Sequence, residues 1–384
     1  LFDDLDITFQ DADVEDLQFR IADLRESART GLDEVVPADP IATDEQRAEL
    51  LFFLGWGKLL AGELFVALPE VGAGVPLAPT ENLQSAVQDF LAAEAIAPDN
   101  AGYKLALARA YYYLGDQANA VQKAQEALTA DPAFTRNVQF DGVNQPDNDF
   151  ADALFDRGNF DDLQPLPRLD FLDPKYFVSG TDESPVYIQK AEEAHMIIAE
   201  GSLADGDLSG AQAAMLNLVG LVNSRSTATF SDAVEDREDR PASPSVMVQA
   251  SAADPLIGGL VLDRQAGNVT IPVISGTSVT DAQVNALADV IAALELLYLM
   301  RQEVFIAEGR RFVDMGIKIP IHENEMLLNS SVEASHLEPF IPSFMPSDLD
   351  GFTFDEGAGT VTITVNMNKV LVDNRTDTSV VPFF

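Results

Sequence analysis

Four charged residues beyond residue 300 have types and a spacing that could support acid–base chemistry. Glu308, Arg310, Arg311 and Asp314 stand in the stretch EGRRFVD, close to the end of a predicted helix. Residues three or four apart share one face of a helix, so Arg310 would face Asp314 and Glu308 would face Arg311. We therefore interpret the group as an ion-pair network that anchors the helix end, with an acid–base cluster as the alternative.

Two other patterns could hold a metal ion. Residues 205–210, DGDLSG, copy the start of a calcium loop, but the twelfth position is Leu216 instead of a bidentate glutamate, so we interpret them as a turn. The three histidines are His195, His322 and His336, and none is followed by the second histidine of a zinc protease motif. The sequence therefore predicts no metal site, no cofactor and no catalytic histidine.

Aromatic residues between positions 134 and 180 are better candidates for a ligand site. Phe155, Phe160, Tyr176 and Phe177 stand among aspartates and asparagines in a stretch without a long helical period. Exposed rings offer apolar faces to sugar C–H groups, and neighbouring carboxylates and amides can bind hydroxyls. These four residues are our predicted ligand-binding residues. The alternative is that the same rings fix a loop to the core.

A helical hairpin over residues 101–132 is the clearest element that the sequence predicts. Small and aromatic residues recur there at helical spacing, interrupted by Leu114-Gly115-Asp116. Glycine favours a left-handed C-cap, and aspartate accepts hydrogen bonds from the free amides of the next helix. Asp131-Pro132 ends the second helix, because proline disfavours a helical residue before it. Within the tyrosine run 111–113, we assign Tyr111 to the core.

This hairpin resembles a tetratricopeptide repeat. The matching residues occupy that repeat's small, aromatic, turn and proline positions: Ala108, Tyr111, Gly115, Ala120, Ala124, Ala127 and Pro132. A second and weaker copy has the same spacing: Ala199, Ser202, Gly206, Ala211 and Leu218.

Other elements follow from apolar periodicity and from capping residues. Helices are predicted over residues 14–32 with an end at Gly31, over 43–65, from a cap at Thr80, over 185–221, and over 280–310 from a cap at Thr280-Asp281. Loops are predicted over residues 35–43 and 68–77. Two β-hairpins are predicted: 260–262 with 269–274 around Gly267-Asn268, and 352–354 with 361–365.

The composition bounds the environment and the class of partner. The chain has 384 residues, 47% of them hydrophobic, and no apolar run long enough to span a membrane. Its net charge of -40 argues against nucleic acid as a partner, because that interaction needs a basic footprint. An acidic chain with few lysines indicates adaptation to high salt, with an acidic secreted protein as the alternative. With no cysteine, disulfides and thiol-based sites are excluded.

Three stretches, in this order, resemble the SusD/RagB family. They are residues 47–83 with a Gly-Val-Pro-Leu loop, residues 173–225, and residues 301–325 with EGRRFVDM followed by KIPI. The resemblance covers most of residues 47–325. It departs from the family at Gln302, where arginine is usual, and in having one tryptophan, Trp56, inside an apolar helix.

The resemblance implies a fold, a location and partners. The fold class it implies is mainly α, with tetratricopeptide-like hairpins under a loop-rich layer that carries small β-hairpins. We expect one SusD-like domain over residues 1–384. Its helical scaffold is expected at about 14–132, 185–225 and 280–316. Its loop-rich segments are expected at 133–184, 226–279 and 317–384. Family members are attached to the outer face of the outer membrane by a lipid, here expected upstream of Leu1. They deliver glycans or other nutrients to a SusC-like, TonB-dependent transporter.

We therefore expect a non-enzymatic protein that captures an oligosaccharide or a similar nutrient, from a halophilic bacterium. One alternative is a tetratricopeptide scaffold that binds protein partners. A glycoside hydrolase with paired carboxylates is another, because the distances between acids cannot be derived from the sequence.

Overall fold

The computed structural model describes residues 5–140, 185–231, 245–249, 257–263, 268–306, 308–347, 349, 352–355, 357–358 and 360–384. Over these residues the predicted fold class is confirmed, because the chain is mainly helical and its strands are short. The chain divides into two compact units, which are described one at a time: Leu1–Phe134, Phe312–Ser343 and Arg375–Phe384 form the first, and Thr135–Arg311 and Phe344–Asn374 form the second. The single domain over 1–384 and its segment boundaries stay predictions.

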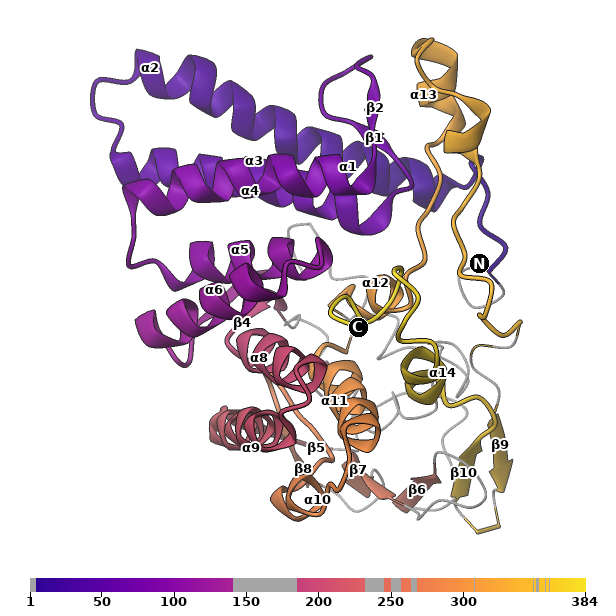
Figure 1. The fold of residues 1–384 in the computed structure, drawn as a ribbon. Helices are drawn as coiled ribbons and strands as arrows, with labels where there is room; N and C mark the ends of the chain where they lie inside the picture. Colours follow the sequence, from indigo (N-terminus) through magenta and orange to yellow (C-terminus); the bar gives the residue numbers. More distant parts are fainter. Residues whose placement is uncertain are drawn as a thin grey trace. The chain divides into compact units, whose positions relative to one another are not determined.

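The first unit is built from helices, with α3 packed against α1 and α4 (Figure 1). Its helices are α1 (Ala12–Thr30), α2 (Val36–Ala38), α3 (Asp44–Leu64), α4 (Pro79–Ile96), α5 (Ala101–Tyr113), α6 (Gln117–Ala130) and α13 (Glu323–Leu328). A π-helical turn (Gly31–Val35), a 3-10 turn (Ala334–Leu337) and the two-residue strands β1 (Leu68–Pro69) and β2 (Pro76–Leu77) complete it. The short helix α12 (Arg311–Asp314) contains the boundary between the units.

Aromatic rings form the centre of the first unit. Phe52 lies 5.4 Å from Trp56, 5.9 Å from Phe90 and 5.7 Å from Tyr103, measured between ring centroids. All four side chains are buried. The predicted start of α3 at Thr43 is confirmed, since its hydroxyl accepts from the Gln46 backbone N–H and the Gln46 side chain accepts from Thr43 N–H.

Two predicted helix boundaries in this unit are wrong. Gly31 does not end the first helix, because its backbone is right-handed (φ -56°) and the chain continues through the π-helical turn into α2. Glycine serves there for close packing, since a Cβ would stand 2.8 Å from Leu50 Cδ2. Thr80 is not the cap of α4: Pro79 takes the first helical position, and the Glu81 carboxylate accepts from Ala78 N–H at 2.8 Å.

The helical hairpin over residues 101–132 forms as predicted, as α5 and α6 packed together. Gly115 has a φ of +71°, and the Asp116 side chain caps α6 by accepting from Asn119 N–H. The assignment of the core tyrosine is off by one residue. Tyr112 is 1% exposed and stacks edge-on against Phe383 at 5.0 Å, whereas Tyr111 is half-buried.

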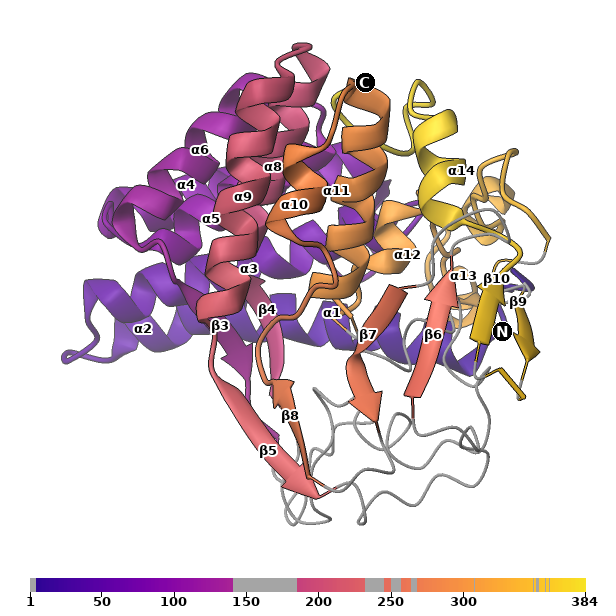
Figure 2. The same cartoon turned by 90° about the horizontal axis from the view of Figure 1, so that it is seen from below.

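The second unit combines helices with small sheets (Figure 2). Its helices are α8 (Glu192–Ala204), α9 (Leu208–Ser224), α10 (Asp281–Asn285), α11 (Val290–Val304) and α14 (Met367–Asp373). Its strands are β3 (Thr135–Val138), β4 (Val186–Lys190), β5 (Thr227–Ser231), β6 (Ser245–Gln249), β7 (Ile257–Asp263), β8 (Asn268–Pro272), β9 (Phe352–Asp355) and β10 (Thr360–Ile363). The sheets are β3–β4, β5–β8 and β7–β6–β10–β9, with β6 and β10 parallel.

Pairing in these sheets tests the predicted hairpins. The hairpin of β9 and β10 is confirmed. The hairpin around Gly267-Asn268 is wrong in its partners, because β7 pairs with β6 and β8 pairs with β5. Residues 186–190, predicted to be helical, form β4: Val, Tyr and Ile favour a strand, and β3 supplies its partner. For β4 and β8 the partner strand is remote in the sequence.

The helix predicted over residues 280–310 is interrupted. Thr280 caps α10 as predicted, with its hydroxyl accepting from Gln283 N–H. The chain then leaves the helix, and Asp289 caps α11 by accepting from Ala292 N–H at 2.8 Å. α11 ends at Val304, and Gly309 has a φ of +69°. Residues 308–314 therefore do not lie on one continuous helix.

Candidate functional site

The predicted ligand-binding residues Phe155, Phe160, Tyr176 and Phe177 lie outside the described residues. Their role stays a prediction. The functional groups considered below belong to the described ranges, each within one unit.

The charged residues near position 310 form ion pairs with residues that are remote in the sequence. Glu308 accepts from Lys190 Nζ at 2.8 Å, and Arg310 Nη2 donates to Glu193 Oε1 at 2.6 Å. Lys190, Glu308, Arg310 and Glu193 are all at most 4% exposed in their side chains. The chain leaves α11 at Val304, before these residues, and the local pairs Arg310–Asp314 and Glu308–Arg311 stay predictions. The interpretation as structural ion pairs holds, with α8 and β4 as the partners.

The residues of the two candidate metal sites belong to a turn, to helix caps and to a helix. Residues 205–207 form the turn between α8 and α9 and residues 208–210 begin α9, with Gly206 at a φ of +75° and the Asp207 side chain capping α9. His322 caps α13 by accepting from Asn324 N–H at 3.3 Å. His195 is half-buried within α8, and burial lowers its pKa. Within the described ranges, no three histidine or carboxylate side chains are grouped to hold a metal ion.

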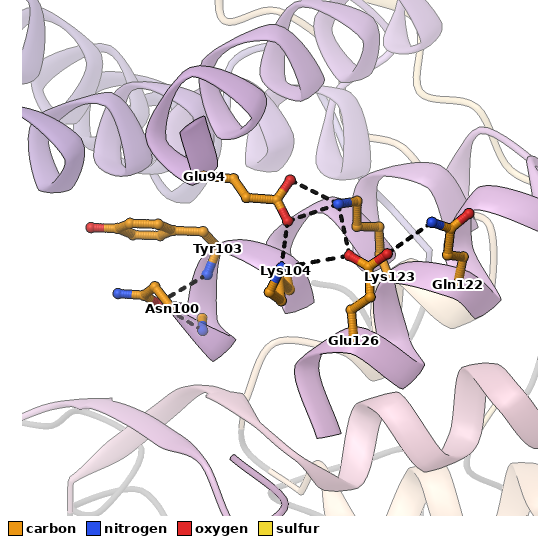
Figure 3. Close-up of polar contacts among 8 residues, drawn as sticks. Glu94, Asn100, Tyr103, Lys104, Gln122, Lys123 and Glu126 are labelled. Atoms are coloured by element: carbon orange, nitrogen blue, oxygen red, sulfur yellow. Dashed lines mark hydrogen bonds and ion pairs between the residues drawn. The ribbon is translucent and has the colours of Figure 1, made fainter. Parts of the chain in front are cut away.

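A cluster of charged side chains links the end of α4 to the α5–α6 hairpin (Figure 3). Lys123 Nζ donates to both Glu94 oxygens at 2.7 and 2.8 Å and to Glu126 Oε2 at 2.9 Å. Lys104 Nζ donates to Glu94 Oε1 at 2.8 Å. We call Glu94, Lys104, Lys123 and Glu126 the hairpin-edge cluster. It brings two of the chain's few lysines together, which the sequence analysis missed because the partners lie on three helices.

Electrostatics fixes the protonation of this cluster. Burial acts to lower the pKa of Lys123, but its hydrogen bonds to Glu94 and Glu126 outweigh burial, and the pKa is raised. The hydrogen bond from Lys123 lowers the pKa of Glu126. Since all three Lys123 protons are used, the binding capacity that remains lies on the carboxylate oxygens, which can accept from hydroxyl groups. Glu126, with a side chain 32% exposed, is the more open of the two carboxylates.

Half-buried Tyr111 lies close enough to this cluster for the Lys123 and Glu94 charges to act on its phenol. Burial raises its pKa, and the nearby carboxylate of Asp116 adds to the effect. An aromatic ring beside carboxylates and the Gln122 amide, which donates to Glu126 at 2.8 Å, is a combination that suits sugar binding.

A second charged cluster in the first unit surrounds Lys58 of α3. Lys58 pairs with Glu70, donates to Ser85 Oγ at 3.0 Å and lies 2.7 Å from Asp89 Oδ2. Burial acts to raise the pKa of Glu70, but Lys58 outweighs it and the pKa is lowered; for Asp89 burial prevails and the pKa is raised. Sequence spacing could not reveal this group, because Glu70 lies in the predicted loop 68–77.

Comparison with known proteins places the fold. No protein-family model and no curated protein matches the chain. A solved SusD superfamily protein from Bacteroides fragilis superposes with a TM-score of 0.55 and 14% identity, over 86% of this chain and 86% of that one. A SusD-like carbohydrate binding protein from Bacteroides vulgatus covers 79% of this chain and 68% of its own length, with 11% identity and a TM-score of 0.39. The fold is therefore SusD-like. Within the described chain, no helix combines the length and hydropathy of a membrane span.

Proposed function

We propose that this chain is a cell-surface protein that captures an oligosaccharide or a similar nutrient without chemical turnover. The observation that carries the proposal is the SusD-like fold, which extends over most of the chain and of the similar Bacteroides fragilis protein. The three SusD/RagB-like stretches support it independently, because they were identified from the sequence alone. Within the proposal, an N-terminal lipid holds the protein on the outer face of the outer membrane, and a SusC-like, TonB-dependent transporter receives the ligand.

Two groups of residues are candidates for contacting the ligand. The first is the aromatic set Phe155, Phe160, Tyr176 and Phe177, whose rings would stack on sugar faces. The second is the hairpin-edge cluster with Tyr111, whose carboxylates would accept from sugar hydroxyls. The net charge of -40 fits a surface exposed to high salt, where screening removes self-repulsion.

A binding screen tests the proposal. Affinity electrophoresis against soluble polysaccharides, at low and at high salt, should show retardation by one class of glycan, and a parallel assay should show no release of reducing ends. Replacing Phe160 or Tyr176 by alanine should weaken binding about three- to tenfold, as expected for one ring contact. Phe19→Ala is the matched control, because Phe19 is 61% exposed on α1 outside both candidate groups.

The two alternatives predict different results. A tetratricopeptide-like scaffold would bind peptides and would bind no glycan. The packed hairpins α5–α6 and α8–α9 are compatible with such a scaffold. A hydrolase would release reducing ends. Delivery of the ligand to a transporter is tested separately, by co-purification with a SusC-like transporter in detergent. A failure to co-purify would count against the transporter as a partner and would leave the proposal of glycan capture intact.

A further inference from the structure

A buried arginine in the first unit has guanidinium atoms without hydrogen-bond partners. Arg25, on α1, is 3% exposed, and neither its Nε nor its Nη1 has a partner among the described residues. Gly57 of α3 makes room for it, because a Cβ at that position would stand 2.5 Å from Arg25 Cγ. Burying an ion without a close partner is unfavourable, because no attraction offsets the loss of its hydration. Burial accordingly lowers the pKa of Arg25 to about 10.

The acids near Arg25 are engaged by other donors. The charges of Glu70 and Glu325 act on the guanidinium, as does the like charge of Arg29. The Glu70 carboxylate forms an ion pair with Lys58 and accepts a hydrogen bond from the Ser85 hydroxyl at 3.1 Å. Glu325 accepts from Asn329 Nδ2 at 2.8 Å. Arg25 is therefore left as a cation with unused, charge-assisted donors inside a very acidic chain.

A short loop carries Glu70, whose charge acts on Arg25. Residues 70–75 join β1 to β2 beside α13 (Figure 1). Their tip is held by hydrogen bonds from Asn329 Nδ2 to Gly74 O at 2.7 Å and from Arg29 Nη2 to Glu70 O at 3.1 Å. Ala73 has a φ of +54°, a left-handed conformation that is unfavourable for a residue with a Cβ. The loop is thus fixed at Glu70 and at Gly74, with an unfavourable backbone conformation between them.

We propose that Arg25 anchors a binding site for a carboxylate-bearing ligand, which becomes accessible when residues 70–75 move. The proposal rests on the proposed function and deepens it, because it names acidic oligosaccharides that contain uronic acids as the ligand class. A carboxylate is the natural acceptor for free guanidinium N–H groups. The single unpaired charge of Arg25 matches a ligand with one negative charge. The neighbouring cation, Lys58, is already paired with the Glu70 carboxylate.

Ligand entry requires the loop to move, because Arg25 is almost inaccessible when it is closed. The Glu70 carboxylate opposes entry, since it adds negative charge beside the site and its backbone carbonyl is bound by Arg29. The overall charge of -40 also repels an anion at low salt. In 1 M salt the Debye length falls to about 3 Å, so only groups in direct contact still act on the ligand.

The test compares acidic probes with neutral ones that are otherwise the same. Oligogalacturonate, oligomannuronate and hyaluronan oligomers are titrated into the protein by calorimetry in 1 M NaCl, each beside its carboxyl-reduced form. We expect at least one acid form to bind at least tenfold more tightly than its reduced form. Binding of neutral glycans without any acid preference would overturn the Arg25 proposal and keep the proposed function. Binding of no glycan of any class would count against the proposed function itself.

Variants then assign the preference to Arg25. Arg25→Met should bind the acid form no more tightly than the reduced form. Glu70→Gln should tighten binding of the acid form several-fold, whereas the control Glu26→Gln should have a smaller effect, because Glu26 is an exposed partner of Arg29.

Stability supplies a readout that needs no ligand. Arg25→Met should unfold at the same urea concentration as the wild type or at a higher one, followed by Trp56 fluorescence in the same unit, because it removes a desolvated cation. A clear drop in that midpoint would show that the guanidinium is satisfied in the folded protein, and the proposal would fail.

Discussion

Two helical hairpins of this chain share a turn and differ in their charges. The α5–α6 hairpin of the first unit and the α8–α9 hairpin of the second both turn on a glycine with positive φ, Gly115 at +71° and Gly206 at +75°. In both, the residue directly after the glycine is the aspartate that caps the second helix, Asp116 for α6 and Asp207 for α9. A few adjacent residues therefore specify the same turn twice, whatever surrounds it.

The charged residues of the two hairpins are used in opposite ways. α8 begins with Glu192 and Glu193, both at most 1% exposed, and their partners Arg225 and Arg310 come from later in the chain. The α5–α6 hairpin carries the hairpin-edge cluster on a partly open face, with side chains 12–32% exposed. α5 also contributes a buried base, Arg109, to Glu63 of α3. Burial, rather than the number of ion pairs, decides how much each hairpin depends on its charges.

The largest expected effect comes from leaving a buried acid of the second hairpin without its partner. Arg225 donates to both oxygens of Glu192, from Nε at 2.8 Å and from Nη2 at 2.7 Å. Arg225→Met should lower the free energy of unfolding by about 3–5 kcal/mol, because an unpaired buried carboxylate remains. Urea unfolding followed by circular dichroism measures this. The double variant Glu192→Gln/Arg225→Met should recover most of the loss, and a single variant within about 1 kcal/mol of wild type would reject the role of burial.

Acid should weaken the second hairpin for the same reason. Burial acts to raise the pKa of Glu192, but the hydrogen bonds and charge of Arg225, with the charge of Lys190, outweigh it and the pKa is lowered. A lowered folded pKa means stability that is fully present above the ordinary glutamate pKa of about 4.3 and lost as the pH falls through the folded value. Between pH 6 and pH 3 the urea midpoint of the wild type should fall more steeply than that of the Glu192→Gln/Arg225→Met variant. Parallel curves would assign acid sensitivity to other groups.

The sequence predicted what depends on neighbouring residues and missed what depends on remote ones. Asp116 and Thr280 were predicted as caps because a cap is defined by the residue and the next three. The position of strand β8 was predicted correctly, but its partner β5 was not. The two paired strands lie about 40 residues apart in the sequence, and local patterns do not show such a pairing. The hairpin-edge cluster and the Lys58 cluster were missed for the same reason, since each is assembled from separate helices.

The two turn glycines should give a smaller and nearly equal effect. Gly115→Ala and Gly206→Ala each place a Cβ on a left-handed residue, which costs about 1 kcal/mol or slightly more. Space does not add to the cost at Gly206, where no atom lies within 4 Å of the new Cβ, and adds little at Gly115, where Pro382 O lies at 3.4 Å. Gly220→Ala in α9 is the control: it has open space and lies inside a helix, so it should stabilise by about 0.5–1 kcal/mol. Urea unfolding of the three variants compares them, and a cost at only one turn would show that the turns are not equivalent.

The smallest effect is expected from the charges of the first hairpin, the hairpin-edge cluster of Figure 3. Lys123 makes three hydrogen bonds to Glu94 and Glu126, but its cluster faces water on one side. Lys123→Met should therefore cost about 0–1 kcal/mol in low salt, as exposed pairs do, and less in 1 M NaCl, because solvent and salt screen the lost attraction. Met keeps the apolar length of the side chain, so packing against α4 and α5 is retained. Urea midpoints at the two salt concentrations measure the difference. A cost as large as that of Arg225→Met would mean that the cluster behaves as a buried one, and the contrast between the two hairpins would not hold.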